Sequence, residues 1–315
     1  MKIVEVFKSI QGEGYLSGTP AIFIRLQGCT LSCPFCDSKY ATIESNENEI
    51  RFNIQNDDNV LEFLDYVHQL SEDSRYKIRL IVITGGEPLL DKNHQFLIPL
   101  CNVLCNLYGF QVDFETNGIN NIADLVEDRC DFITRFFGIT EKLYTFSGAL
   151  SLSTLFSGQE KEVKYNNTVA FNTKNRPYTG FFVVSPKFDM RSYNNKVSIS
   201  QVIKYYLPDS LFDLDNFKWL LSSVRFKLLY SKENEDDIYL FIDRLESIAN
   251  KISPLLYKNY VQELVYIMPL MPLEDYTREK YEEVCRETFE FCVKNGLCYS
   301  PRLHIDVWGP NKRSV

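Results

Sequence analysis

The sequence predicts an α/β fold built around a mainly parallel sheet. Short runs rich in β-branched and aromatic residues alternate along the chain with stretches of helical periodicity, which is the pattern of repeated βα units. Several polar or glycine-containing motifs come directly after the predicted strands, and in α/β proteins ligands bind at the carboxyl ends of the strands. These observations together predict a binding site along one rim of the sheet.

The strands are recognised by runs of apolar and aromatic residues, and the helices by apolar residues that recur every three or four positions. The predicted strands are Lys2–Phe7, Ala21–Gln27, Ile78–Thr84, Gln111–Thr116, Gly180–Val184, Val224–Leu229 and Leu264–Met268. The predicted helices are Val60–Leu70, Asn93–Leu107, Asp236–Lys251 and Thr277–Asn295. The last helix is expected to stop at Asn295-Gly296, because glycine readily takes the backbone conformation that ends a helix.

The chain has 315 residues and is interpreted as one domain over residues 1–315. One segment, from about 130 to 180, differs from the rest because it is polar and aromatic with weak periodicity. It is predicted to be an insertion between two core elements. A lid and a partner surface both remain open as its role.

The composition excludes some classes of function. The net charge is -8, whereas non-specific nucleic-acid binding needs a basic face, so no nucleic-acid partner is expected. No apolar run approaches the ~20 residues of a membrane span, so no membrane partner is expected. The start, Met1–Lys8, alternates charged and apolar residues like a strand rather than a signal peptide. A cytoplasmic location is therefore expected, with the cysteines as reduced thiols or metal ligands.

Three cysteines lie close together after the second predicted strand. Cys29, Cys33 and Cys36 form a C-x3-C-x2-C run. Three thiolates at this spacing can reach three corners of one cubane cluster and leave the fourth iron open for another ligand. Three unrelated core cysteines are one alternative, and a zinc site lacking its fourth ligand is another. Structural zinc sites typically use four ligands in paired motifs, so the spacing favours an iron–sulfur cluster.

Five other cysteines are interpreted as structural. Cys101 and Cys105 lie one helical turn apart and are expected to fill the core. Cys285, Cys292 and Cys298 are spaced too widely for a second cluster.

The C-x3-C-x2-C spacing is that of the radical S-adenosylmethionine superfamily, and Gly85-Gly86-Glu87-Pro88 resembles the GGEP motif of that superfamily. A Gly-Gly-Glu-Pro turn alone is ordinary turn chemistry, but at about 50 residues behind the cysteines it is discriminating. The resemblance implies a [4Fe–4S] cluster on the three cysteines, with S-adenosylmethionine on the open iron. This cofactor supplies a 5′-deoxyadenosyl radical.

Further motifs are similar to those of one family within this superfamily, the 7-carboxy-7-deazaguanine synthases. They are Ser9-Ile10-Gln11-Gly12-Glu13-Gly14, Gly18-Thr19-Pro20, Phe23-Ile24-Arg25-Leu26, Cys36-Asp37-Ser38, Glu115-Thr116-Asn117-Gly118, Ser185-Pro186-Lys187 and the tail Leu303-His304 … Trp308-Gly309 … Asn311-Lys312-Arg313. The resemblance covers roughly 1–130 and 180–315 and omits the insertion.

This resemblance implies a carbon–nitrogen lyase that converts 6-carboxy-5,6,7,8-tetrahydropterin to 7-carboxy-7-deazaguanine by radical ring contraction with loss of ammonia, in queuosine and 7-deazapurine biosynthesis. It also implies an incomplete (βα)6-type radical S-adenosylmethionine barrel of about six parallel strands, a homodimer, Mg²⁺, and an electron donor such as flavodoxin or ferredoxin.

The resemblance also assigns roles to residues, motif by motif. The expected substrate contacts are Ile10, Gln11, Gly12, Arg25, Thr84 and His304. The expected contacts of S-adenosylmethionine are Gly86, Glu87, Asn117, Ser185, Pro186 and Lys187. Ser38 is expected to offer its hydroxyl to Mg²⁺, and no protein general base is assigned.

Several of these residues have a structural alternative. Arg25 lies in an apolar strand, where a guanidinium needs an anionic partner, and either a substrate carboxylate or a core acid would serve. Ser38 is either a magnesium ligand or a helix-capping hydroxyl. Lys187 either pairs with a carboxylate of the cofactor or is a solvated loop lysine. His304 either contacts the pterin or packs in the core, and Gly12 either approaches a flat ligand or forms a turn.

Two other functions are consistent with the cysteines. A glycyl-radical-enzyme activase of the same superfamily would abstract hydrogen from a partner protein, and the Gln11–Gly14 motif and the C-terminal match count against it. A non-catalytic iron–sulfur or zinc module that binds proteins through the insertion is the second. Arg25, Gly85–Pro88 and Ser185–Lys187 together count against that module.

Overall fold

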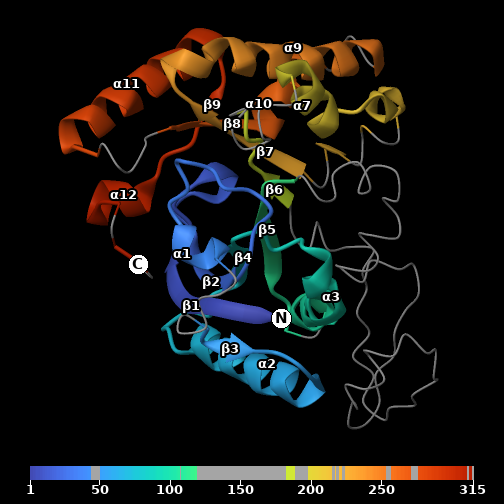
Figure 1. Ribbon diagram of the computed structural model, residues 1–315, viewed down its shortest axis with the longest axis vertical. Coiled ribbons are helices and arrows are strands. Elements are labelled where there is room, and N and C mark those ends of the chain that lie inside the picture. Colours follow the sequence, from blue (N-terminus) through green and yellow to red (C-terminus); the bar gives the residue numbers. More distant parts are fainter. Residues whose placement is uncertain are drawn as a thin grey trace.

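The computed structural model describes residues 1–43, 50–106, 108–118, 182–188, 198–214, 217, 220–221, 224–252, 257–270, 276–310 and 312–313. The insertion predicted near 130–180 lies outside the described residues. Within them the chain folds as strands and helices around one sheet (Figure 1).

The sheet of the described residues has the strand order β3-β1-β2-β4-β5-β6-β7-β8-β9. Its strands are β1 (Lys2–Ile10), β2 (Pro20–Leu26), β3 (Phe52–Asn53), β4 (Leu80–Gly85), β5 (Gln111–Thr116), β6 (Phe182–Val184), β7 (Val224–Tyr230), β8 (Val265–Pro269) and β9 (Cys298–Tyr299). β1 pairs antiparallel with β2 and β3, and each neighbouring pair from β2/β4 to β8/β9 is parallel. The order ends at β3 and β9, so this mostly parallel sheet does not close into a barrel. The predicted incomplete α/β barrel is confirmed in this form.

Helices lie between the strands in sequence, and one more follows the last strand. The described α-helices are α1 (Lys39–Thr42), α2 (Asp57–Glu72), α3 (Asp91–Asn106), α7 (Ile199–Tyr206), α9 (Glu235–Ile252), α10 (Tyr257–Leu264), α11 (Arg278–Asn295) and, after β9, α12 (Leu303–Trp308). α3 packs on β5, α9 and α10 on β7, and α11 on β8. Figure 1 shows α9 and α11 at one end of the fold and α2 at the other. The predicted strands and helices are present with ends shifted by a few residues, whereas the short helices α1, α7, α10 and α12 and the short strands β3 and β9 were not predicted.

Capping residues mark the start of α2 and both ends of α11. The Asn56 side chain accepts a hydrogen bond from the Asn59 N–H at 3.0 Å at the start of α2. The Thr277 hydroxyl accepts one from the Lys280 N–H at 3.2 Å at the start of α11. α11 stops at Gly296, whose φ of 65° is left-handed, so the predicted helix end is confirmed.

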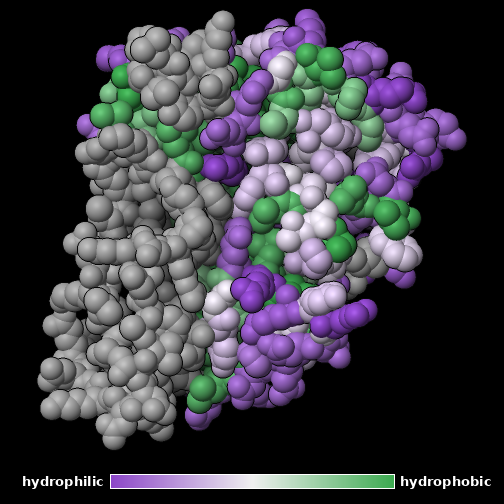
Figure 2. Space-filling model, turned by 180° about the vertical axis from the view of Figure 1, so that it is seen from behind, coloured by the Kyte–Doolittle hydropathy of each residue, from purple (hydrophilic) through white to green (hydrophobic). Residues whose placement is uncertain are grey.

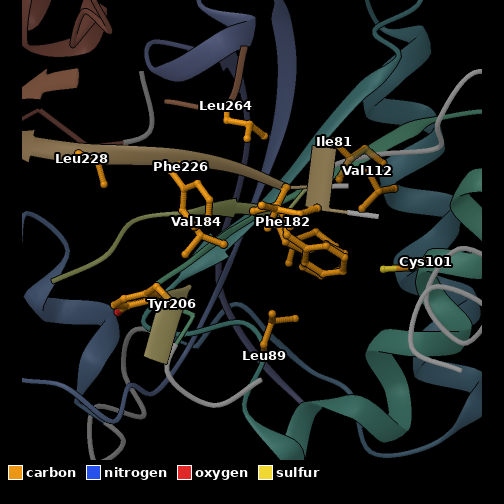
Figure 3. Packing of buried hydrophobic residues seen from close by; sticks show 14 of the residues in the cluster. Ile81, Leu89, Cys101, Val112, Phe182, Val184, Tyr206, Phe226, Leu228 and Leu264 are labelled. Atoms are coloured by element: carbon orange, nitrogen blue, oxygen red, sulfur yellow. The ribbon is translucent and has the colours of Figure 1, made fainter. Parts of the chain in front are cut away.

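The hydrophobic core lies between the sheet and the helices that cover it. β4 is buried at every position, as expected for a parallel strand covered on both faces. Figure 3 shows Phe182 and Phe226, on the neighbouring strands β6 and β7, within this core, together with Tyr206 of α7. Cys101 and Cys105 are also buried there, which confirms their predicted role in filling the core.

The outer surface of the described residues is mixed in character. Figure 2 shows, on the face seen from behind, hydrophilic side chains over much of the described surface, with hydrophobic ones in several separate groups between them. Among the described helices, none has the length and apolar character needed to cross a bilayer.

The loops that follow β2 and β4 touch backbone to backbone. The Gly86 N–H donates to the Leu26 carbonyl at 3.0 Å, and the Glu87 N–H donates to the Gly28 carbonyl at 2.6 Å. A Cβ atom on Gly86 would lie 2.0 Å from the Gly28 oxygen, and one on Gly85 would lie 2.2 Å from the Leu26 oxygen. The two glycines of the predicted motif are therefore required by the close approach of these loops.

We expect Gly86→Ala to lower the free energy of unfolding by more than Gly18→Ala does. Gly18 has a φ of 92° but nothing within 4 Å of an added Cβ, so its substitution should cost only backbone strain, about 1 kcal/mol. An added Cβ at Gly86 meets backbone that cannot rotate away, which should cost about 3 kcal/mol or more. Urea unfolding of the two variants measures the difference, and equal losses would contradict the close contact.

Candidate functional site

A cavity of about 540 Å³ opens at the carboxyl ends of the parallel strands. Its wall includes residues that follow β2, β4, β5, β6, β8 and β9, and residues within β7. The predicted site residues that line it are Ile10, Gln11, Gly12, Arg25, Cys29, Cys33, Cys36, Ser38, Thr84, Gly86, Asn117, Ser185, Lys187 and His304. Glu87 and Pro186 are buried and are not part of its lining. The structure thus brings together the motifs that the sequence analysis expected on a single rim.

The cysteine loop connects β2 to the short helix α1. Gly28, with a φ of 101°, turns the chain out of β2. Its N–H donates to the Ala41 carbonyl at 2.8 Å, which closes the loop at its base. The Cys36 N–H donates to the Cys33 carbonyl at 3.2 Å, so these two cysteines belong to one tight turn. Cys29, Cys33 and Cys36 all line the cavity.

The thiols are surrounded mainly by neutral donors. Cys29 Sγ accepts from the Leu31 N–H at 3.4 Å and from the Asn117 side-chain amide at 3.7 Å. Cys36 Sγ lies 3.9 Å from the Ser38 hydroxyl. Burial raises the pKa of Cys29 and the pKa of Cys36. A bound metal ion is the charge that would make these thiols ionise and bind as thiolates.

Lys187 brings a positive charge to this part of the cavity. Its Nζ donates to the Ser185 hydroxyl at 2.9 Å and lies 5.9 Å from the centroid of the Phe35 ring. Burial lowers the pKa of Lys187, and the nearby Cys33 opposes this shift. The lysine is partly buried in the cavity wall, which argues against the solvated-loop alternative.

Glu87 connects the loop after β4 to the loop after β5. It is fully buried, with an exposed fraction of 0%. Its carboxylate accepts from the Thr116 hydroxyl at 2.7 Å, the Asn117 N–H at 2.8 Å and the Leu89 N–H at 2.9 Å. These hydrogen bonds favour the ionised form, but burial outweighs them and raises the pKa of Glu87. Glu87 therefore shapes the rim through hydrogen bonds within the protein, and its direct contact with S-adenosylmethionine stays a prediction.

Asn117 is held from both sides of its backbone. Its N–H donates to Glu87, and its carbonyl accepts from the buried Tyr206 hydroxyl at 2.7 Å. This fixed backbone leaves the side-chain amide directed at Cys29, where it donates to the sulfur. The amide is thus placed beside the predicted cluster and lines the cavity.

Arg25 has an acidic partner within the protein. Its Nε donates to Glu5 Oε2 at 3.0 Å, and the Tyr40 hydroxyl donates to the same oxygen at 2.9 Å. The structural ion pair that the sequence analysis kept as an alternative is therefore present. Arg25 still lines the cavity, and a guanidinium has five N–H donors, so contact with a substrate carboxylate stays a prediction.

Oxygen atoms gather around Ser38. It is the N-cap residue of α1, but its side chain makes no capping hydrogen bond, so the capping alternative is wrong. Its hydroxyl lies 3.3 Å from Asp37 Oδ1 and 3.4 Å from the Gly85 carbonyl oxygen. Hydroxyl, carboxylate and carbonyl oxygens are the ligands that Mg²⁺ prefers, so this donor set fits the ion. The role of Ser38 as a ligand stays a prediction.

An ion network that the sequence analysis missed also lines the cavity. Lys227 Nζ donates to Glu13 Oε2 at 2.5 Å and to Glu115 Oε1 at 3.3 Å. Arg302 connects Glu13, at 3.4 Å, to Asp37, at 2.6 Å. Burial opposes ionisation of Lys227, but Glu115 and Glu13 raise its pKa. Burial likewise opposes ionisation of Glu13, but Lys227 and Arg302 lower its pKa.

The sequence of β7 contained a signal for this network. Its residues alternate between the two faces of the sheet, so Arg225, Lys227 and Leu229 share one face. A lysine inside an apolar strand has to be paired when the strand is buried. Lys227 was therefore a candidate for a site residue from the strand pattern alone.

The C-terminal segment forms part of the cavity wall. The Leu303 N–H donates to the Gly12 carbonyl at 3.1 Å, and the Gly14 N–H donates to the Ser300 hydroxyl at 2.7 Å. A Cβ on Gly12 would lie 3.3 Å from His304 Nδ1, so the absence of a side chain at Gly12 allows this close packing. The His304 side chain is 32% exposed in the cavity wall, which argues against the core-packing alternative.

The residues present fit a [4Fe–4S] cluster with S-adenosylmethionine. Three thiols face one cavity, and no fourth cysteine of the described residues lines it, which leaves one corner of a cubane open. Hydrogen bonds from the Leu31 N–H and the Asn117 amide to the Cys29 sulfur suit a thiolate ligand. Lys187 shares the cavity wall with Cys33 and Cys36, and its positive charge would suit a carboxylate of the cofactor.

A family model described as the Radical SAM superfamily matches residues 23–135. The matched stretch contains Cys29, Cys33, Cys36 and the turn Gly85–Pro88. The resemblance to this superfamily that the motifs predict is confirmed over that part of the chain.

Curated 7-carboxy-7-deazaguanine synthases are also similar to this chain. The synthase of Hyperthermus butylicus is 41% identical over 122 residues, which are 38% of this chain and 43% of the relative. The synthase of Escherichia coli strain K12 is 38% identical over 128 residues, which are 38% of this chain and 54% of the relative. The chain thus spans about half the length of these relatives. The predicted resemblance to these synthases is confirmed over that length.

Among solved structures, the crystal structure of QueE from Escherichia coli aligns with 95% of this chain and with 92% of that chain. The TM-score is 0.49 and the sequence identity is 21%.

We expect Glu87→Gln to lower the free energy of unfolding by about 1–3 kcal/mol. In the wild type both carboxylate oxygens of Glu87 accept from backbone N–H groups, and in the variant the side-chain NH₂ group would face one of these donors. The exposed Glu62 has no partner among the described contacts, and Glu62→Gln should change stability by less than about 0.5 kcal/mol. Urea unfolding of the metal-free protein checks both values. Equal stability of the two variants would show that Glu87 does not hold the loops together.

Proposed function

We propose that this chain is a radical S-adenosylmethionine enzyme, a carbon–nitrogen lyase, that converts 6-carboxy-5,6,7,8-tetrahydropterin to 7-carboxy-7-deazaguanine. The observation that carries the proposal is that the thiols of Cys29, Cys33 and Cys36 share one cavity with the strand-end motifs. The similarity to 7-carboxy-7-deazaguanine synthases supports the choice of substrate.

Cys29, Cys33 and Cys36 would hold the cluster, and the open corner would take S-adenosylmethionine. When bound, the cluster and this cofactor supply a radical that removes a hydrogen atom from the substrate. Lys187 is placed to pair with the carboxylate of the cofactor, and Ser185 accepts a hydrogen bond that orients the lysine.

The other contacts of the cofactor come from the strand ends. Gly86 lies in the cavity wall beside the cysteine loop, where its backbone carbonyl would accept a hydrogen bond from the cofactor, since its N–H donates to Leu26. The Asn117 amide, which donates to Cys29, lines the cavity beside the predicted cluster. Glu87 and Pro186 would act by fixing these loops.

The pterin would lie against Ile10, Gln11 and Gly12 of the N-terminal segment, Thr84 of β4 and His304 of the C-terminal segment, which all line the cavity. The Gln11 amide donates to Glu115 Oε1 at 3.2 Å, and the Thr84 hydroxyl donates to Glu115 Oε2 at 3.2 Å. These hydrogen bonds orient polar groups around a flat ligand before it binds, which lowers the entropy that binding would cost.

The carboxylate of the pterin is the second polar group to be bound. Arg25, and a Mg²⁺ ion at Ser38 and Asp37, would provide positive charge for it. The proposal further includes a homodimer, a cytoplasmic location and an electron donor such as flavodoxin or ferredoxin, and the product would feed 7-deazapurine biosynthesis.

An anaerobic assay tests the proposed function. Reconstituted protein is incubated with dithionite, S-adenosylmethionine, Mg²⁺ and 6-carboxytetrahydropterin, and the products are identified by mass spectrometry. We expect 7-carboxy-7-deazaguanine. Accumulation of 5′-deoxyadenosine without that product would retain the superfamily and overturn the pterin substrate. Failure to form either product with an intact cluster would favour the non-catalytic iron–sulfur module.

Cys33→Ala should abolish both iron binding and turnover, because it leaves only two of the three thiolates that would hold the cluster. Cys101→Ala is the matched control, since Cys101 is buried in α3 and does not line the cavity. This control should retain the iron content and the product. Iron and sulfide analysis with the assay above provides the measurement, and turnover by Cys33→Ala would refute the cluster assignment.

A further inference from the structure

Lys227 is a buried, charged residue in the cavity wall, and none of the predicted motifs includes it. Its side chain is 7% exposed, and it lies on the face of β7 that also carries Leu229, another cavity residue. The flanking residues Phe226 and Leu228 point into the hydrophobic core. A charge in such a place is stable only with partners, so its contacts indicate its role.

The partners of Lys227 come from two distant segments. Glu13 belongs to the loop after β1, and its side chain is 12% exposed, while Glu115 belongs to β5 and its side chain is 19% exposed. Lys227 lies between them, with its Nζ at 2.5 Å from Glu13 and 3.3 Å from Glu115. Both carboxylates line the cavity. The lysine therefore holds two acids side by side in a place where they would otherwise repel each other.

The two carboxylates have acceptor capacity beyond their partners in the protein. An ionised carboxylate offers about four lone-pair sites. Among the described residues, Glu13 Oε1 has only the longer contacts to Arg302, at 3.4 Å, and to His304, at 3.9 Å. Glu115 Oε2 accepts one hydrogen bond, from the Thr84 hydroxyl. A ligand in the cavity with a row of N–H groups could use the remaining sites.

We propose that Lys227 is a positioning residue, which holds Glu13 and Glu115 ionised and side by side as acceptors for the N–H groups of the aminopyrimidinone edge of the substrate. This inference rests on the proposed function, because a tetrahydropterin carries its amino and ring N–H groups along one edge. Without the lysine, one of two adjacent buried acids takes up a proton and presents a donor where the substrate also has donors. Lys227 acts through the carboxylates and does not touch the reacting atoms.

The test compares Lys227→Met with Lys227→Arg. The reconstituted holoprotein with S-adenosylmethionine and without reductant is titrated anaerobically with 6-carboxytetrahydropterin by calorimetry. Lys227→Met should raise the Kd of the pterin about tenfold or more, whereas Lys227→Arg, which restores the charge, should recover most of the affinity. In the assay with reductant, the KM for the pterin should rise more than kcat falls. The Kd of S-adenosylmethionine and the iron content should not change.

Lys8→Met is the matched control. Lys8 lies on β1, forms an exposed ion pair with Asp73 with an N–O distance of 2.8 Å, and does not line the cavity. It should bind the pterin like the wild type. If Lys227→Met does not fold, Lys227→Gln keeps an uncharged NH₂ donor group and should give an intermediate Kd.

The outcomes separate this inference from the proposed function. A wild-type protein that does not bind the pterin overturns the proposed function, and this inference with it. A wild type that binds the pterin no better than Lys227→Met or Lys227→Gln overturns the role of Lys227 alone. Equal losses of pterin affinity, S-adenosylmethionine affinity and iron in the methionine and arginine variants would show a structural role instead.

Discussion

The contact between the loops after β2 and β4 is the constraint on which the site depends. Gly86 approaches the Gly28 carbonyl so closely that no side chain fits between them. The next residue, Glu87, is buried and accepts hydrogen bonds from the loop after β5. Three neighbouring loops are thereby fixed relative to one another. The cysteine loop begins at Gly28, so the position of the thiols follows from this backbone contact.

Several of the charged residues that line the cavity form ion pairs within the protein. Arg25 is paired with Glu5, Arg302 with Asp37 and Glu13, and Lys227 with Glu13 and Glu115. Removing charges from water is costly, and such pairing offsets the cost only where both partners are held in place. The pairs here connect the N-terminal loop, β5, β7 and the C-terminal segment. The same ion pairs therefore arrange the wall of the site and connect distant parts of the chain.

Local patterns predicted the regular elements and the cysteine site. The strands and long helices follow from periodicity, and the run from Cys29 to Cys36 is contiguous in sequence, so both are visible without a structure. The partners within the ion network could not be predicted from local patterns, because they are far apart in sequence. Lys227 is 214 residues from Glu13, and Arg302 is 289 residues from Glu13. Arg25 shows the same limit, since the strand pattern required an acidic partner but could not distinguish Glu5 from a substrate. Glu87 was assigned to the cofactor from its motif, while its hydrogen bonds to the loop after β5 depend on the fold.

The central claim is that three cysteines hold a [4Fe–4S] cluster with one iron open to S-adenosylmethionine. Electron paramagnetic resonance of the reconstituted, dithionite-reduced protein, recorded with and without S-adenosylmethionine, tests this claim most directly. We predict the signal of a reduced cluster, with g-values that shift when S-adenosylmethionine is added, because a ligand on one iron changes the electronic structure of the whole cluster. A cluster signal that S-adenosylmethionine leaves unchanged, or a protein that binds zinc in place of iron, would contradict the claim.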